Sequence, residues 1–432
     1  MDVLDKNTRI KETYSETMLR RKSQYPNVIL VKIQENKLNK VQQQALKMCF
    51  VEAKWLYNYI LNLSKDNSVD IFKLNYKDLD TITHFDKHKN PIVSKLSYLS
   101  SQMRQDIIKG ICTNISNLAK AKKKGLEVGG LKFISDYTSI NLKQYGVSYK
   151  LVGKNKIKIQ GIKKPIKVNG LKQLNRFKNY ELANSKLISR ADGYFIAITV
   201  YVPLTHKPVC PKTKGTIGID MGCSTSFTLS NGEKFSYYVE ENEQVKKLQK
   251  QLERKKKGSS NRWKTRKKLR KAYQKDINRK DDIAKKFCAS LRNYQIVMQD
   301  EQLASWKENG HGKKVHHSVM GRVKEYLIND GAFVLSKWIP TTKMCRKCGT
   351  KVSLTEKDRE FICPCCGFKE DRDIHAAKNM IWFKENIIGV ERTEYLPVVF
   401  KENLQKYFGT FLDWLDKQTS QEQEAANSLG SR

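Results

Sequence analysis

A short apolar run that ends in a carboxylate and a glycine turn constrains the fold of this 432-residue chain most strongly. Residues 216–219 read Thr-Ile-Gly-Ile, as a buried central strand does, and Asp220 lies where the strand meets Met221 and Gly222. A carboxylate there is costly unless a hydrogen-bonded cap or a metal ion compensates it. Taken alone, an Asx-type turn that caps the strand explains Asp220 as well as a metal site does.

Two later stretches place further carboxylates in comparable positions. Residues 295–299 (QIVMQ) form a second apolar strand that runs directly into Asp300 and Glu301. Residues 371–373 (Asp-Arg-Asp) open an apolar-striped helix, where acidic residues are also common as N-caps. Carboxylates at two strand ends and one helix start predict a converging site. An all-oxygen ligand set suits Mg²⁺ or Mn²⁺, with phosphate oxygens completing the shell.

The cysteine spacing carries the strongest single motif in the chain. Cys345 and Cys348 are separated by two residues, and after fourteen more the sequence reads Cys363-Pro-Cys-Cys366-Gly. Thiolates on two tight turns can complete one tetrahedral shell, which predicts a structural zinc ribbon and leaves Cys365 surplus. The other cysteines are scattered singly, as reduced thiols in a cytoplasmic protein would be, so a disulfide framework is not expected.

The charge balance predicts a polyanionic partner. The chain carries 82 Lys and Arg against 44 Asp and Glu, a net charge of +38, which exceeds what solubility requires. Residues 246–286 hold 19 of the basic residues and 4 acidic ones, with helical apolar spacing on both sides of a break at 258–261. We expect an antiparallel helical hairpin that binds phosphates. Trp263 and Tyr273 could stack on bases, although their spacing favours packing.

The N-terminal half of the chain has a different pattern of apolar residues. Residues 1–24 are polar and are expected to fray, and residues 26–33 predict a strand. Apolar residues at helical spacing follow up to residue 125, and residues 129–203 then break into short strands that indicate a small barrel or sandwich. No run is apolar enough to span a membrane, and the N-terminus lacks the order of a secretory signal, so we expect a cytoplasmic protein.

Together these motifs resemble a known family. The order Gly218-Ile219-Asp220, then Glu301-x-Leu303, then the four-cysteine ribbon followed by DRDIHAAKNM is similar to the split RuvC-like nuclease of the TnpB transposon proteins and of the miniature type V-F CRISPR effectors. The resemblance implies an RNase H-like domain with Asp220, Glu301 and Asp373 as catalytic, magnesium-binding carboxylates. It also implies that Cys345, Cys348, Cys363 and Cys366 bind zinc.

Two positions are chosen by the match to the family pattern. Asp373 is preferred to Asp371 because it precedes the x-(Asn)-Ala-Ala step, in which His375 stands where the family usually has Asn. We expect that departure to affect helix capping more than metal binding. Glu301 is preferred to Asp300 because it begins the Glu-x-Leu pattern, and Asp300 stays an alternative.

The resemblance implies an α+β multidomain architecture. An N-terminal β-barrel (wedge) carries an inserted helical recognition domain, and a C-terminal RuvC-like α/β domain carries the zinc ribbon. The expected segments are a flexible N-terminus at 1–24, the wedge barrel at 25–37 and 126–205, the recognition insertion at 38–125, the nuclease domain at 206–343 with its basic hairpin at 242–292, the ribbon at 344–370, the last nuclease segment at 371–406, and a tail at 407–432.

The implied function is an RNA-guided, Mg²⁺-dependent DNA endonuclease of a bacterial or archaeal cytoplasm, acting at the nucleoid. Guide RNA, together with target double-stranded and single-stranded DNA, would be its partners, and a short flanking DNA motif would be read. The motifs do not separate a transposon TnpB, which would act as one subunit, from an antiviral type V-F effector, which would act as a homodimer on one guide RNA.

Two other classes stay open at this point. A nuclease-inactive, RNA-guided repressor of the same fold would usually lose a carboxylate, whereas all three positions are filled here. A zinc-ribbon RNA-binding protein would explain the charge and the cysteines. It would leave Asp220 and Glu301 unexplained.

Overall fold

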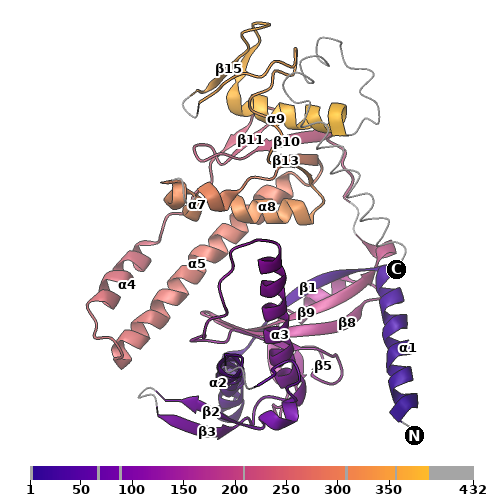
Figure 1. Ribbon diagram of the computed structural model, residues 1–432, viewed down its shortest axis with the longest axis vertical. Helices are drawn as coiled ribbons and strands as arrows, with labels where there is room; N and C mark the ends of the chain where they lie inside the picture. The colour runs from indigo at the N-terminus through magenta and orange to yellow at the C-terminus, as the bar shows by residue number, and fades with distance from the viewer. Residues whose placement is uncertain are drawn as a thin grey trace. The chain divides into compact units, whose positions relative to one another are not determined.

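The computed structural model describes residues 3–65, 69–86, 90–207, 210–306, 310–355 and 358–388. The chain divides into two compact units, Met1–Pro208 and Val209–Arg432, whose elements are drawn in Figure 1. The expected tail at 407–432, like residues 389–406 of the last nuclease segment, lies outside the described residues. Among the helices that the structure describes, none combines the length and the apolar character needed to cross a membrane.

The first unit is built on a seven-stranded antiparallel sheet with strand order β4-β8-β9-β1-β7-β6-β5. Its two end strands, β4 and β5, are joined by the short segment 143–148, in which Tyr145 forms an isolated bridge with Tyr149 of β5, and the sheet is nearly closed. The strands are β1 (Gln24–Ile33), β4 (Ser139–Leu142), β5 (Tyr149–Val152), β6 (Lys156–Ile159), β7 (Ile166–Asn169), β8 (Glu181–Arg190) and β9 (Gly193–Pro203).

The sheet core follows from strict alternation along the strands. In β1 the side chains of Ile29, Val31 and Ile33 are buried, and in β9 so are Ile196 and Ile198, while the residues between them are more exposed. This period of two is the pattern of a sheet with one face on the core. The near-closed sheet agrees with the predicted barrel.

The insertion between β1 and β4 contains more than the expected helices. Helix α2 (Lys40–Leu63) begins with a capping box between Asn39 and Gln42, and α3 (Ser101–Lys123) is capped by Ser100. Between them a two-stranded hairpin, β2 (Thr81–Phe85) and β3 (Pro91–Lys95), was not predicted. Its alternating residues are few, and its packing on the insertion depends on contacts such as the stack of His84 on Trp55.

The N-terminal segment is helical over α1 (Val3–Lys22), where the sequence predicted a frayed end. The physical reason lies at its last turn, which is attached to the sheet. Arg20 and Arg21 pair with Glu181 at 2.8 and 3.2 Å, and the Arg21 guanidinium lies 3.6 Å from the centre of the Tyr201 ring. Composition alone does not reveal such tertiary contacts.

The second unit is built on a five-stranded mixed sheet with strand order β12-β11-β10-β13-β14. The strands are β10 (Thr216–Asp220), β11 (Phe227–Leu229), β12 (Lys234–Phe235), β13 (Gln295–Gln299) and β14 (Phe333–Leu335). Strands β10, β13 and β14 are parallel, whereas β11 and β12 are antiparallel to their neighbours. The carboxyl ends of β10 and β13 therefore lie at the same edge of the sheet.

Helices cover both faces of this sheet (Figure 1). On one face, α5 (Ser260–Ser290) and α8 (Met320–Asn329) pack against the apolar side chains of Ile217 and Ile219. On the other face, α9 (Arg372–Phe383) packs on β10, and a five-residue π-helical turn, Lys384–Ile388, continues it. Shorter helices, α6 (Leu303–Trp306) and α7 (Gly312–His317), follow β13.

Helix α9 approaches β10 so closely that a glycine is required. A Cβ atom at Gly218 would lie 1.9 Å from the carbonyl oxygen of Ala377. Because side chains alternate along a strand, Gly218 and Asp220 share the face that α9 covers. The apolar strand pattern thus carries Asp220 to the face on which α9 packs.

The basic hairpin consists of α4 (Glu243–Glu253) and α5, which pack on each other. Its small core contains Val245, Leu248, Leu269 and Ala272, with Tyr273 partly buried beside them. Trp263 does not pack as its spacing suggested: the residue is 63% exposed, and the Lys267 ammonium lies 5.7 Å from its ring centre.

Candidate active site and metal centre

The first acidic residue closes the central strand of the second unit. Asp220 is the last residue of β10, and it is partly buried on the face covered by α9. Burial raises the pKa of its carboxyl well above the usual range, and the negative charges of Asp373 and Glu301 raise it further, while Arg372 opposes them. These influences bring all three predicted carboxylates to one neighbourhood.

The second acidic residue follows β13, at the neighbouring strand end. Two adjacent carboxylates stand there, and their surroundings separate them. Asp300 Oδ1 accepts a hydrogen bond from Lys324 Nζ at 2.6 Å, so its charge is already paired. Among the described residues the Glu301 carboxylate has no hydrogen bond or ion pair, and burial raises its pKa, against the charge of Lys324. The pairing therefore favours Glu301 as the residue with ligand oxygens to offer.

The third acidic residue lies in the first turn of α9, where two aspartates have different partners. Asp371 is the N-cap, since its Oδ1 accepts from the backbone N–H groups of Asp373 and Ile374 at 3.1 Å each. Its Oδ2 pairs with Lys234 at 2.7 Å. The cap interpretation of this acidic run thus applies to Asp371, whereas the negative charge of Asp373 acts on Asp220.

Arg372 supplies a positive charge inside this acidic neighbourhood. Its Nε and Nη2 donate to Asp373 Oδ1 at 3.2 and 3.1 Å, with about four-fifths of each side chain covered. Within the described ranges the three carboxylates do not form a group whose ligand oxygens all lie within 4.8 Å of one another. In this geometry the Arg372 guanidinium is paired with the Asp373 carboxylate.

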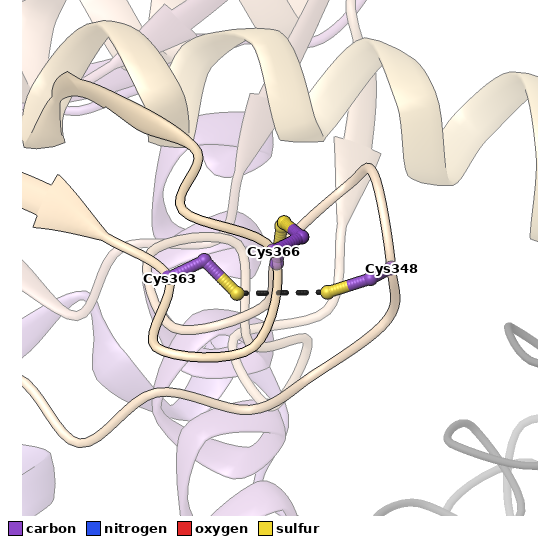
Figure 2. Close-up of side chains that lie close together, drawn as sticks. Cys348, Cys363 and Cys366 are labelled. Atoms are coloured by element: carbon purple, nitrogen blue, oxygen red, sulfur yellow. Dashed lines mark hydrogen bonds between the residues drawn. The ribbon is translucent and has the colours of Figure 1, made fainter.

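The four predicted zinc ligands do form such a group. The Sγ atoms of Cys345, Cys348, Cys363 and Cys366 all lie within 4.8 Å of one another. Figure 2 shows the Sγ atoms of Cys348 and Cys363 turned toward each other, 3.5 Å apart, with Cys366 beside them. Cys345 and Cys366 are 3.6 Å apart. A zinc tetrahedron with bonds of about 2.3 Å has edges of about 3.8 Å, so the four thiols fit that ion.

The ribbon around these thiols is small. Strands β15 (Glu360–Ile362) and β16 (Lys369–Asp371) form a hairpin whose core contains Phe361. The fifth nearby cysteine, Cys365, is exposed and stands outside the four-thiol group, as the spacing predicted.

His375 does not contribute to helix capping, contrary to expectation, because Asp371 is the cap. Its ring is fully buried, stacked on Phe361 at 3.7 Å between ring centres, and its Nε2 lies 2.8 Å from the carbonyl oxygen of Met344. Burial lowers the pKa of His375 to about 4, with the charge of Arg346 acting in the same direction. The residue is thus a neutral packing partner for the ribbon.

Sequence reasoning missed other buried polar residues near the acidic group, namely Gln299, Thr341 and Asn379. Asn379 lies four residues after His375, on one face of α9, and this i, i+4 pair of polar residues inside an apolar stripe was an available signal. Gln299 and Thr341 gave no comparable signal, because they belong to separate segments that meet only in the folded unit.

Comparisons with known proteins match the segments that hold these residues. Residues 198–304 match the family model OrfB_IS605, described as "Probable transposase". Residues 332–380 match the model described as "Cas12f1-like, TNB domain". The first range contains Asp220 and Glu301, and the second contains the four thiols and Asp373.

One curated relative and one solved structure complete these comparisons. A protein of Streptomyces pristinaespiralis named "Putative RNA-guided DNA endonuclease" is 29% identical over 205 residues, which cover 44% of this chain and 50% of that protein. The chain thus spans half the length of this relative. A structure titled "Cryo-EM structure of the Cas12f1-sgRNA-target DNA complex" matches 79% of this chain and 81% of its own, with 14% identity and a TM-score of 0.40, a level that is not evidence for a shared fold.

Proposed function

We propose that this chain, a TnpB- and Cas12f-like protein, is an RNA-guided DNA endonuclease with a RuvC-type centre made of Asp220, Glu301 and Asp373. One observation carries the proposal. The pKa of Asp220 is raised by burial and by the negative charges of Asp373 and Glu301, so the fold brings two acids that are distant in sequence close to a third. Clustered acids that perturb one another are typical of functional sites, since stability alone would disfavour them.

The three carboxylates would hold divalent ions, for which Mg²⁺ is the natural choice with hard oxygen ligands. When bound, such ions activate a water molecule and stabilise the leaving 3′ oxygen of the phosphodiester. The chain's own residues prepare that chemistry. Asp220 and Glu301 project from the ends of adjacent parallel strands, and Asp373 from the first turn of a helix packed on them. Asp220 and Asp373 belong to regular elements, and Glu301 lies two residues after the end of β13.

Neighbouring charges influence the protonation and the ion pairing of the carboxylates before ions bind. The raised pKa of Asp220 favours a retained proton, which must leave for that carboxylate to become a ligand. Arg372 must release Asp373 Oδ1 for the same reason, and its guanidinium then stands beside the centre, where a scissile phosphate would need positive charge. Asp300 is paired with Lys324, so we do not expect it to bind the divalent ions. No protein nucleophile is required, because water supplies the attacking oxygen.

The phosphates of a nucleic acid would neutralise the excess positive charge of the chain. The net charge of +38 and the 19-to-4 excess of basic residues at 246–286 leave few internal partners, which supports phosphate binding along the α4–α5 hairpin. Guide RNA would provide sequence recognition by pairing, and the N-terminal unit would read a short flanking motif on the DNA.

The test is cleavage by the purified full chain with guide RNA, target DNA and Mg²⁺. We expect Asp220→Ala to lower the cleavage rate by about 1,000-fold or more, since a metal ion contributes several kcal/mol to such a step. Guide-dependent DNA binding should stay within about threefold of the unchanged protein. Undiminished cutting by Asp220→Ala would refute the assignment.

The same assay separates the other classes. Guide-dependent binding without cleavage by the unchanged protein would indicate a repressor, and RNA binding without guided DNA binding would indicate a zinc-ribbon RNA-binding protein. The mass of the guide complex distinguishes the two branches of the family, with one chain per guide for a transposon protein and two for an antiviral effector.

A further inference from the structure

A group of buried polar side chains lies near the four-thiol ribbon and near two elements of the candidate centre: β13, which Glu301 follows, and α9, whose first turn holds Asp373. Gln299, Thr341, His375 and Asn379 have exposed fractions of 6%, 2%, 0% and 0%. Buried polar groups are retained where they are hydrogen-bonded, because an unpaired one costs about 1 to 3 kcal/mol. Their partners therefore reveal what this group holds in place.

Gln299 fixes the end of β13, two residues before Glu301. Its Nε2 donates to the carbonyl oxygens of Ile339 at 2.7 Å and Ser336 at 3.0 Å, and its Oε1 accepts from Thr341 Oγ1 at 2.7 Å. A single side chain thus binds the segment 336–341 at three points. This segment leads toward the first zinc ligand.

Asn379 and His375 fix α9 to the same segment. Asn379 Nδ2 donates to the carbonyl oxygens of Thr341 at 2.6 Å and Met344 at 2.8 Å. His375 Nε2 lies 2.8 Å from the Met344 oxygen, and since a carbonyl only accepts, this nitrogen carries the proton. Met344 directly precedes Cys345, so α9 is bonded to the residue that leads into the first zinc knuckle.

A second attachment comes from inside that knuckle. Arg346 lies between Cys345 and Cys348, and its Nη1 donates to Glu370 Oε2 at 2.6 Å and to the unprotonated His375 Nδ1 at 3.0 Å. Lys378 of α9 pairs with the other oxygen of Glu370 at 2.5 Å. The knuckle and the helix therefore share a network whose members are largely removed from water, where such bonds are strengthened.

We propose that Gln299, Thr341, His375 and Asn379 are positioning residues that couple the zinc ribbon to the carboxylate centre. They bind β13 and α9 to one segment, residues 336–344, whose end is held by the first knuckle. Zinc then sets the geometry of Glu301 and Asp373 without touching either carboxylate. The inference rests on the proposed function, since its effect is exerted through those two acids.

Thr341 allows the sharpest test, because Thr341→Val keeps the shape and removes the hydroxyl, while Thr341→Ser restores it. Thr216→Val is the matched control: Thr216 Oγ1 lies 3.5 Å from Gln295 Oε1, at the opposite end of β10 and β13. For each full-length variant, zinc per chain and Mn²⁺ affinity are measured, the latter from the paramagnetic resonance signal of free Mn²⁺. Asp220→Ala defines the part of Mn²⁺ binding that belongs to the carboxylates.

We expect Thr341→Val to retain one zinc per chain and to bind Mn²⁺ at the carboxylates about fivefold or more weakly, the effect of roughly 1 kcal/mol. Thr341→Ser and Thr216→Val should bind as the unchanged protein does. Unaltered Mn²⁺ affinity in zinc-loaded Thr341→Val would overturn the coupling.

A second measurement covers the case in which Thr341→Val loses zinc or fails to fold. Zinc is stripped from the unchanged protein with a chelator, the chelator is dialysed away, and Mn²⁺ affinity is measured again before and after zinc is restored. A reversible weakening supports the coupling, and an unchanged affinity overturns it. If the unchanged, zinc-loaded protein shows no Asp220-dependent Mn²⁺ binding, the proposed nuclease centre itself fails.

Discussion

The two candidate metal centres of the second unit differ in how close together the folded chain brings their ligand atoms. The four thiols of the ribbon lie within 4.8 Å of one another, whereas the three carboxylates do not, and one of them is paired with Arg372. Thiol groups can approach one another closely, whereas carboxylates repel one another and take up protons or cationic partners. A structural ion completes a set of ligands that the fold already brings together. A catalytic ion would have to displace a proton or a cationic side chain before it binds.

The largest expected effect concerns the thiols. Cys345→Ser removes one of four ligands, and the binding of structural zinc is on the order of 10 kcal/mol in small domains, so the variant should lose its zinc and the order of its ribbon. Zinc content after dialysis against a weak chelator checks this. Cys365→Ser, which alters the exposed surplus thiol, is the control and should keep one zinc per chain. Full zinc retention by Cys345→Ser would contradict the assignment.

The next effect separates two adjacent acids. Glu301→Gln should lower the cleavage rate by about 100-fold or more, because a direct ligand is lost. Asp300→Asn should change that rate by less than about tenfold, since Asp300 already pairs with Lys324. Single-turnover cleavage at saturating Mg²⁺ measures both rates. The reverse order would show that Asp300 is the ligand and that Lys324 moves away from it.

A pH series tests whether protonation of Asp220 weakens the binding of a metal ion. Because the pKa of Asp220 is raised, its proton competes with metal at pH values above the usual carboxyl range. Mn²⁺ affinity should be full above that raised pKa and should fall by up to about tenfold per pH unit below it. Asp220→Asn removes this competition, so its residual Mn²⁺ binding should lose the corresponding slope. An equally steep slope in Asp220→Asn would assign the proton to another group.

The smallest effect tests the ion pair that balances Asp373. Arg372→Gln removes the charge that is paired with Asp373 Oδ1, so Mn²⁺ should bind about threefold to tenfold more tightly, the effect of a hydrogen bond worth about 0.7 to 1.4 kcal/mol. Calorimetric titration measures the change. Arg359→Gln, which alters an arginine outside the acidic group, serves as the comparison. Weaker Mn²⁺ binding by Arg372→Gln would mean that the guanidinium orients Asp373 for the metal rather than competing with it.

The sequence predicted the residues of each candidate centre only where the indicative pattern lay within one short segment. The four thiols that are predicted to bind zinc follow a spacing that two tight turns impose, and all four lie together in the ribbon. Asp220 was marked by the apolar strand before it. The choice between Asp371 and Asp373 required the family pattern, and the structure adds the reason why Asp371 has another task as the helix cap.

Features that depend on distant segments were not predictable in the same way. Gln299, Thr341 and Asn379 look like ordinary polar residues until three segments meet. The exposure of Trp263 and the helical N-terminus contradicted expectations based on local pattern, because the packing partners of a helix decide both. The near-closed sheet of the first unit was foreseen from alternation, but the β2–β3 hairpin inside its insertion was not.

The bare backbone at Gly218 has a consequence for engineering. With the Ala377 carbonyl where a methyl group would stand, even alanine at position 218 must lift α9 from the strand and carry Asp373 with it. Every acid, thiol and basic residue would remain, so the electrostatic surface offered to a polyanion would be preserved. If the proposed function is correct, Gly218→Ala should therefore give a form of the protein that binds its target DNA without cutting it.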